Sequence, residues 1–287
     1  MDVYPFILHL GPLEITGYGI MMMAGFLMGG WLIGLELKRH GLMADYGSEV
    51  VVAAVIGGIL GAKLWYVALT QDMDALFSRG GLVWYGGFLG GSAAVALNGW
   101  RRRVPVRWTA HVLAPALAAA YALGRVGCFM VGDDYGRPTS LPWGIRFGQG
   151  LPPSTAQNLN SLFGIPMPVG VDPNAVLAVH PTQLYEVAAM MVAFGFLWKL
   201  RKREWGLGAL FGLYLMIAGT ERFLVEFVRA KDDRLLGPFT LAQAMSALLV
   251  VVGVVVWRWL RNAPAVDPGE FLKAVGAPEV SKTATAN

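Results

Sequence analysis

Two arginines inside apolar segments carry the strongest chemical signal in this sequence. Arg125 interrupts an apolar run that leads into the glycine-rich, acidic stretch ending at Thr139, and Arg222 lies in a second apolar run. A guanidinium at membrane depth is costly unless an anion meets it, so such a residue indicates a functional site. Because the planar guanidinium fork matches phosphate oxygens, two arginines at similar depth predict a phosphate clamp.

Charged neighbours accompany these arginines. Glu226 follows Arg222 by four residues, which places both side chains on one helix face and predicts an ion pair that holds Arg222 in place. Arg229 lies a further turn along, and Lys63 lies in another apolar run. An ion pair that only joins helices is the structural alternative, because charged groups inside membranes pair with one another.

A histidine at the start of an apolar run is a further candidate. His180 opens the motif HPTQLYE, in which Gln183, Tyr185 and Glu186 follow within about two helical turns. A position at the start of a helix explains His180 equally well, because the next residue, Pro181, is favoured in the first helical turn.

Tyr18, Tyr85 and Cys128 each have two interpretations. Tyr18 and Tyr85 lie near the outer boundary, where aromatic belts of membrane proteins are common. Cys128 is the single cysteine, so it forms no disulfide within the chain. It is expected to be a small buried residue in a packed helix end. The alternative is a nucleophile whose thiol pKa is lowered by Arg125.

The composition places these residues in a membrane. Hydrophobic residues make up 55% of the chain and charged residues 15%, and the mean hydropathy is +0.52. Apolar stretches of roughly 20 residues are long enough to cross a bilayer as helices, and they lack the alternation of porin strands. The sequence therefore predicts an all-α integral membrane protein, a seven-transmembrane helix bundle with spans near 17–36, 48–70, 81–99, 109–131, 181–199, 206–228 and 238–260.

Basic residues between these stretches predict the orientation, because Lys and Arg accumulate on the cytoplasmic side. Clusters at 38–39, 101–107, 199–203 and 258–261 all fall on one side of the predicted bundle. The N-terminus is therefore expected outside and the C-terminus inside. The net charge of +4 follows largely from this bias, and nothing in the sequence supports nucleic-acid binding.

The loops and the termini complete the expected organisation. The longest connection, residues 131–180, is rich in proline and contains aromatic residues, which predicts a small ordered head outside the membrane. Residues 1–262 are expected to form one membrane domain, and residues 263–287 a mostly disordered cytosolic tail. No Cys and His spacing typical of metal ligands and no nucleotide-binding glycine fingerprint occurs, so neither a metal nor a cofactor is expected.

The chain resembles the prolipoprotein diacylglyceryl transferases of bacterial inner membranes. Motifs matching in order are GYGI, GAKLWY, GGLVWYGGFLGG, GRVGCFMVGDDYGRPT, HPTQLYE and ERFLVEFVR, and the likeness covers roughly residues 6–260. It implies a multi-pass enzyme of the inner membrane whose active site faces the periplasmic leaflet. Such an enzyme moves the diacylglyceryl group of phosphatidylglycerol to the lipobox cysteine of a preprolipoprotein signal peptide, which forms a thioether and releases glycerol phosphate.

The resemblance also implies roles for individual residues. Arg125 matches the lipid-binding arginine of the family motif GRxGN, Arg222 matches the second essential arginine, and Glu226 matches the acid that follows it. The remaining matched residues are expected to bind substrate, in a site that is in contact with membrane lipids. They are Tyr18, Lys63, Gly136, Gln183, Tyr185 and Arg229.

Three positions depart from the family pattern. Cys128 replaces an asparagine, Asp133 replaces a glutamate, and Tyr85 replaces the histidine of an HGG motif. The substrate thiol must become a thiolate before it attacks, and Tyr85, His180 or Asp133 could take its proton. A tyrosine would need a pKa depressed by nearby cations. The sequence does not choose among these three.

Two further interpretations use the same residues. One is a transporter or flippase for an anionic lipid or small anion, in which the arginines bind without chemistry. Transporters tend to have inverted repeats and interrupted helices at the midplane, and the sequence shows neither. The other is a family member with a changed acceptor, which the three departures keep open.

Overall fold

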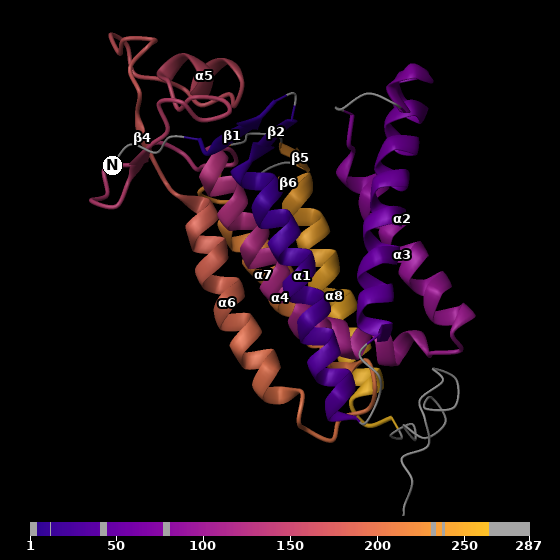
Figure 1. The fold of residues 1–287 in the computed structure, drawn as a ribbon. Coiled ribbons are helices and arrows are strands. Elements are labelled where there is room, and N and C mark those ends of the chain that lie inside the picture. Colours follow the sequence, from indigo (N-terminus) through magenta and orange to yellow (C-terminus); the bar gives the residue numbers. More distant parts are fainter. Residues whose placement is uncertain are drawn as a thin grey trace, which may run out of the picture.

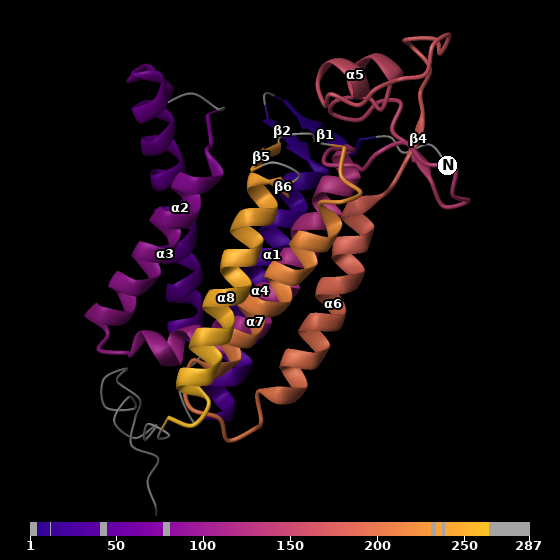
Figure 2. The ribbon, with the colours of Figure 1, turned by 180° about the vertical axis from the view of Figure 1, so that it is seen from behind.

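Each predicted apolar stretch contains one long helix, and the helix bounds agree with the predicted ones to within one turn (Figures 1 and 2). The computed structural model describes residues 5–11, 13–40, 45–76, 81–230, 234–236 and 239–263. The predicted cytosolic tail therefore lies almost wholly outside the described residues. The long helices are α1 (Gly17–Arg39), α2 (Asp45–Thr70), α3 (Trp84–Arg101), α4 (Val106–Val131), α6 (Thr182–Leu200), α7 (Ala209–Val225) and α8 (Leu241–Leu260).

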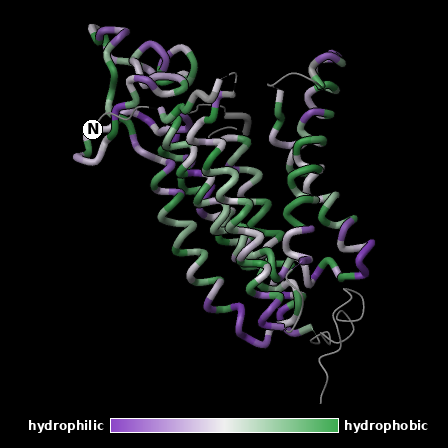
Figure 3. Tube along the Cα trace, viewed as in Figure 1, coloured by the Kyte–Doolittle hydropathy of each residue, from purple (hydrophilic) through white to green (hydrophobic). Residues whose placement is uncertain are grey.

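Four of these helices, α1, α2, α4 and α8, are long and apolar enough to cross a membrane. Hydrophobic residues follow the length of the helices, whereas hydrophilic residues gather toward their ends and in the loops (Figure 3). The protein is therefore a mostly helical, multi-pass membrane protein, as expected. The number of seven spans and the outward N-terminus remain predictions.

Short strands accompany the helices at one end of the bundle. Three antiparallel two-stranded sheets lie at the end of the bundle that also carries α5 (Ala156–Ser161), and we call this end the head end (Figure 1). There the backbone leaves its helices, and strand pairing satisfies the exposed N–H and C=O groups. The pairs are β1 (Ile7–Leu10) with β2 (Leu13–Thr16), β3 (Ile145–Arg146) with β4 (Ala178–Val179), and β5 (Arg234–Leu236) with β6 (Phe239–Thr240). A single 3₁₀ turn, η1 (Asp74–Leu76), follows α2.

Helix α4 is the central helix, in contact with α1, α6 and α7. Its alanines make this possible, because small side chains let neighbouring helices approach closely. Ala116 and Ala119 pack into a core with α1, and Ala118 and Ala122 pack into a second core with α6 and α7. The arrangement brings the head ends of α4, α6 and α7 together.

Helices α2 and α3 form a pair that stands to one side of the other helices (Figures 1 and 2). Glycines let the two helices of this pair approach closely. A Cβ atom at Gly61 would overlap the carbonyl oxygen of Gly86, and one at Gly90 would overlap that of Gly57. Helices α7 and α8 use the same device, because a Cβ atom at Gly253 would lie 2.7 Å from the Gly212 carbonyl oxygen.

The segment between α4 and α6 is a packed unit with its own apolar core. The rings of Tyr135 and Phe147 stack with centroids 5.4 Å apart. Strands β3 and β4 close this unit, and Ala230, just beyond α7, joins its core. The buried residues of the core are Tyr135, Ile145, Phe147, Leu159, Ile165, Val179 and Ala230.

Candidate active site

A continuous chain of ion pairs lies at the head end of α4, α6 and α7. In its outer part, the Asp134 carboxylate bridges two arginines. Its Oδ2 lies 2.8 Å from Nη1 of Arg125, and its Oδ1 lies 2.5 Å from Nη2 of Arg229. The arginine that shares a carboxylate with Arg125 is therefore Arg229, which the sequence placed a turn farther out than Arg222.

Two deeply buried glutamates pair with Arg125 and Arg222. Oε2 of Glu186 lies 2.7 Å from Nε of Arg125, and Oε2 of Glu226 lies 2.6 Å from Nη1 of Arg222. The same Glu226 oxygen lies 3.9 Å from Nε of Arg229, so Glu226 links Arg222 to Arg229. The predicted pair between Arg222 and Glu226 is confirmed. Both glutamate side chains are 1% exposed.

The C-terminal end of α4 sets the position of the outer carboxylates. Gly132 ends the helix in the left-handed conformation at φ 68°, and its N–H donates to the carbonyls of Cys128 and Phe129. The chain then turns toward the start of α6. There the Gln183 amide donates to the Asp133 carbonyl, and the Thr182 hydroxyl donates to the Asp134 carbonyl over 2.7 Å.

Backbone contacts fix Arg229 to the start of the head. Arg229 forms an antiparallel bridge with Gly136, and Nε of Arg137 donates to the Arg229 carbonyl over 3.1 Å. Gly136 has no room for a side chain, because a Cβ atom would lie 2.5 Å from the Val228 carbonyl oxygen and 2.7 Å from Cβ of His180. Close packing therefore explains why a glycine is required at position 136, whereas its contact with substrate stays a prediction.

Three residues that the sequence did not single out belong to this cluster. The Tyr121 hydroxyl donates to Oε1 of Glu186 over 3.2 Å, and its ring lies 5.3 Å from the Arg125 guanidinium carbon. Glu221 is buried, and its Oε1 accepts no hydrogen bond from the described residues. Asp134 is the third. Only Tyr121 carried a usable signal, because it precedes Arg125 by one helical turn.

The two adjacent aspartates have opposite electrostatic environments. Burial, with the negative charge of Asp134 beside it, raises the pKa of Asp133 to about 6. Burial alone would also raise the pKa of Asp134, but Arg229 and Arg125 hold it below its ordinary value. Oδ1 of Asp133 is buried and accepts no hydrogen bond from the described residues. Asp133 is therefore poised to take a proton near neutral pH, whereas Asp134 stays ionised.

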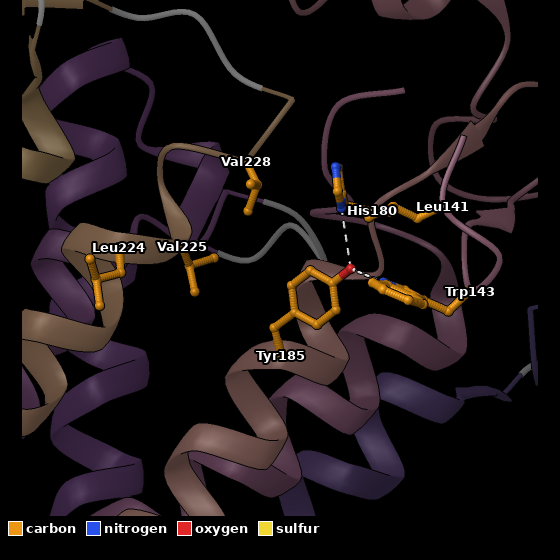
Figure 4. A pocket seen from close by; sticks show the side chains of 7 residues that line it. All are labelled: Leu141, Trp143, His180, Tyr185, Leu224, Val225 and Val228. Atoms are coloured by element: carbon orange, nitrogen blue, oxygen red, sulfur yellow. Dashed lines mark hydrogen bonds between the residues drawn. The ribbon is translucent and has the colours of Figure 1, made fainter. Parts of the chain in front are cut away.

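His180 and Tyr185 line an apolar pocket of about 470 Å³ rather than the arginine cluster (Figure 4). The Tyr185 hydroxyl accepts from Nε1 of Trp143 over 2.8 Å and lies 3.2 Å from Nδ1 of His180. Burial lowers the pKa of His180, which favours its neutral form. The remaining lining is aliphatic: Leu141, Leu224, Val225 and Val228.

Other predicted site residues lie at different distances from the arginines. Tyr18, on α1, is close enough to Arg125 and Asp133 to interact with their charges. Its backbone packs closely against Gly127 of α4, because a Cβ atom on Gly127 would lie 3.1 Å from the Cα atom of Tyr18. Lys63 and Tyr85 belong to the separate α2 and α3 pair. The exposed ring of Tyr85 packs edge-on against Trp84, with centroids 5.3 Å apart.

One group of described side chains has the ligand types of a metal site. Atoms of Cys128, Asp133 and Asp134 lie within 4.8 Å of one another. The Asp134 carboxylate already binds two guanidiniums, which would repel a cation at this position. The charges here therefore suit an anion better than a metal ion.

Comparisons with known proteins identify relatives of this chain. Residues 5–259 match the family model described as prolipoprotein diacylglyceryl transferase. Proteins named phosphatidylglycerol--prolipoprotein diacylglyceryl transferase are similar over nearly their full lengths. The one from Cupriavidus metallidurans is 34% identical over 90% of this chain and 94% of its own. The one from Clostridium tetani is 31% identical over 88% and 96%, and that from Burkholderia thailandensis 32% over 91% and 96%.

Proposed function

This chain belongs to the prolipoprotein diacylglyceryl transferase family, and from that premise we propose that it moves the diacylglyceryl group of phosphatidylglycerol to a prolipoprotein cysteine. The observation that carries the proposal is the linked set of three arginines at one end of a membrane bundle. The family match and the names of the relatives favour this transfer over the transporter considered above.

We propose that the bundle crosses the bacterial inner membrane seven times, with residues 1–262 as one membrane domain and the head in the periplasm. The basic loops at the opposite end support this orientation, because positive charge accumulates in the cytoplasm. Helix α7, with 17 residues, spans about 26 Å and approaches the ~30 Å thickness of the hydrocarbon core. The active site would then face the periplasmic leaflet, where the lipid and the signal peptide meet.

The arginines are proposed to bind the lipid phosphate. As the bond between glycerol carbon and phosphate oxygen breaks, negative charge grows on the departing glycerol phosphate. Arg125, Arg222 and Arg229 stabilise that charge because their guanidiniums are already oriented. Glu186 and Glu226 keep Arg125 and Arg222 oriented, because each is a buried countercharge to one of these arginines.

Asp133 is the residue we propose as proton acceptor for the substrate thiol. Its raised pKa, its half-buried position and its unpartnered Oδ1 support this role. The proton moves from sulfur to the Asp133 carboxylate, the thiolate attacks the glycerol carbon, and a carbon–sulfur bond replaces the carbon–oxygen bond. Tyr85 and His180 have weaker support, because Tyr85 lies on α3 and His180 lines the apolar pocket.

The remaining predicted residues are assigned by their surroundings. Tyr18 faces the arginine cluster and is proposed to line the lipid site. Gln183 positions the Asp133 carbonyl from α6. The pocket beside Tyr185 suits an aliphatic part of a substrate rather than its headgroup, because most of its lining side chains are apolar. We propose no metal or cofactor.

A transfer assay tests the function directly. Purified protein is incubated with phosphatidylglycerol carrying labelled acyl chains and a peptide that contains a lipobox cysteine, and the thioether product is measured. Arg125→Ala and Arg222→Ala are expected to lower the rate at least about 100-fold. Arg146→Ala, on the exposed side of strand β3, is the matched control and should keep the normal rate. Near-normal rates in both cluster variants would end the proposal.

A further inference from the structure

We propose that the Asp134 carboxylate occupies the position of the lipid phosphate and must leave when the lipid binds. Asp134 then acts as an internal competitor that sets the KM for the anionic lipid. The inference rests on the proposed function, because it concerns the same site.

The geometry of Asp134 resembles that of a bound phosphate. Its two oxygens reach two different guanidiniums, Oδ2 to Arg125 and Oδ1 to Arg229. A phosphodiester presents two charged oxygens in the same way, and guanidiniums bind both groups through paired N–H donors. Arg125 and Arg229 are therefore already held at a separation that suits one bridging anion.

Exposure distinguishes Asp134 from the other carboxylates of the cluster. Its side chain is 39% exposed, whereas those of Glu186 and Glu226 are 1% exposed. Solvent therefore hardly reaches the two glutamates. Asp134 lies on the outer side, where a headgroup must approach. It is the one carboxylate of this chain of ion pairs that can exchange water for its guanidinium partners.

The backbone around Asp134 allows the side chain to leave without moving the loop. The carbonyl of Asp134 stays bonded to the Thr182 hydroxyl, and the neighbouring Asp133 carbonyl stays bonded to the Gln183 amide. These bonds involve backbone carbonyls and not the Asp134 carboxylate, so the proposed withdrawal is a rotation about the Cα–Cβ bond of Asp134. Its left-handed backbone, at φ 55°, is maintained by these carbonyl bonds throughout.

Charge balance requires the exchange. A phosphate beside an ionised Asp134 would place two anions within one site, and like charges at such a distance repel strongly. Replacement of the carboxylate by the phosphate keeps the net charge around Arg125 and Arg229 constant. Binding of the lipid is therefore weakened by the free energy needed to separate Asp134 from its two arginines.

Kinetics of Asp134 variants in mixed micelles test this inference. At pH 8, where Asp133 is ionised whether or not Asp134 carries its charge, Asp134→Asn and Asp134→Ser remove the competing charge, so KM for phosphatidylglycerol should fall about fivefold. Inhibition by glycerol phosphate, a soluble probe of the same site, should strengthen in parallel. Asp134→Glu keeps the charge and should not lower KM. Asp172→Asn, an exposed head residue that caps the Asn174 N–H, is the matched control.

The outcomes separate this inference from the proposed function. A KM that is unchanged or raised in both neutral variants would show that Asp134 only positions the arginines, and the inference would be wrong. If either variant fails to fold, the other variant and the Asp134→Glu comparison decide. If the wild-type protein makes no thioether product, the proposed function fails instead, whatever the variants do.

Discussion

Glu186 on α6 and Arg125 on α4 form a buried ion pair in which Oε2 lies 2.7 Å from Nε. The pair joins two helices at the level where the candidate site begins, and Tyr121 donates a hydrogen bond to the other glutamate oxygen. Arg125 is thus held on its inner side by a group that solvent does not reach. Its outer side remains available for an exchangeable anion.

Replacement of Glu186 by glutamine should impair both catalysis and stability. The variant leaves Arg125 without its buried countercharge, and breaking a buried pair in this way is strongly destabilising. We expect kcat/KM to fall about 100-fold, which corresponds to ~2.7 kcal/mol of lost transition-state stabilisation. The transfer assay and the thermal unfolding midpoint in detergent measure the two effects. Glu204→Gln, in the exposed turn after α6, should change neither quantity.

The proposed role of Asp133 predicts a pH profile. Its pKa of about 6 means that the base form disappears on acidification, so kcat/KM should rise with pH up to about 6 and then level off. Asp133→Asn should lose this dependence together with most of the activity, whereas Asp133→Glu should keep a pH-dependent rate. A wild-type profile that is flat between pH 5 and pH 7, by contrast, would assign the proton to another group.

Asp133 makes the folded protein less stable as the pH rises, whereas an ordinary ion-paired carboxylate makes it more stable. Its folded pKa lies above the ordinary value of 3.8, so the folded protein binds more protons than the unfolded chain between about pH 4 and pH 6. The contribution of Asp133 to stability is therefore largest at low pH and is lost as the pH rises through about 6. A comparison of unfolding midpoints for the wild type and Asp133→Asn across this range measures the difference.

Cys128 is expected to be dispensable for the chemistry. The thiol is buried at the end of α4, and its sulfur lies 3.8 Å from Nη1 of Arg125. Cys128→Ala should keep the transfer rate within about fivefold, because it removes little volume and no proposed reacting group. Rates in the presence of a thiol-alkylating reagent should also be nearly normal when the peptide is added after the reagent is quenched. Complete inactivity of Cys128→Ala in a folded protein would favour a covalent intermediate on this sulfur.

The α2 and α3 pair should be sensitive to added methyl groups. Gly61→Ala places a Cβ atom against the Gly86 carbonyl oxygen, so the two helices must separate, and we expect destabilisation of about 1–3 kcal/mol. Gly58→Ala on the same helix is the control, because its Cβ atom would lie 3.6 Å from the Gly87 carbonyl oxygen, an ordinary contact. Equal unfolding midpoints for the two variants would contradict this account of the packing.

Local patterns predicted the helices and one ion pair. Apolar length located each helix, and the four-residue spacing of Arg222 and Glu226 predicted their contact. The helix ends shifted where turn chemistry intervened. The last predicted apolar stretch begins at 238, but Thr240 caps α8 with Gln243 in a reciprocal capping box, so the helix begins at Leu241.

Contacts between distant segments could not be predicted in this way. The bridge from Arg125 through Asp134 to Arg229 joins the end of α4, the start of the head and the end of α7, and no spacing rule connects these positions. The link between Glu186 and Arg125 depends likewise on how α6 packs against α4. Glu221 is next to Arg222 in the sequence, yet its burial follows only from the packing around α7.

The antiparallel bridge between Gly136 and Arg229 makes the start of the head and the end of α7 a single mechanical unit. Hydrogen bonds between Arg137 and the Val228 and Arg229 carbonyls complete that unit. The arginines are therefore arranged when the chain folds, and no free energy is needed to arrange them again in each catalytic cycle. A scaffold arranged in this way needs little reorganisation when a substrate binds.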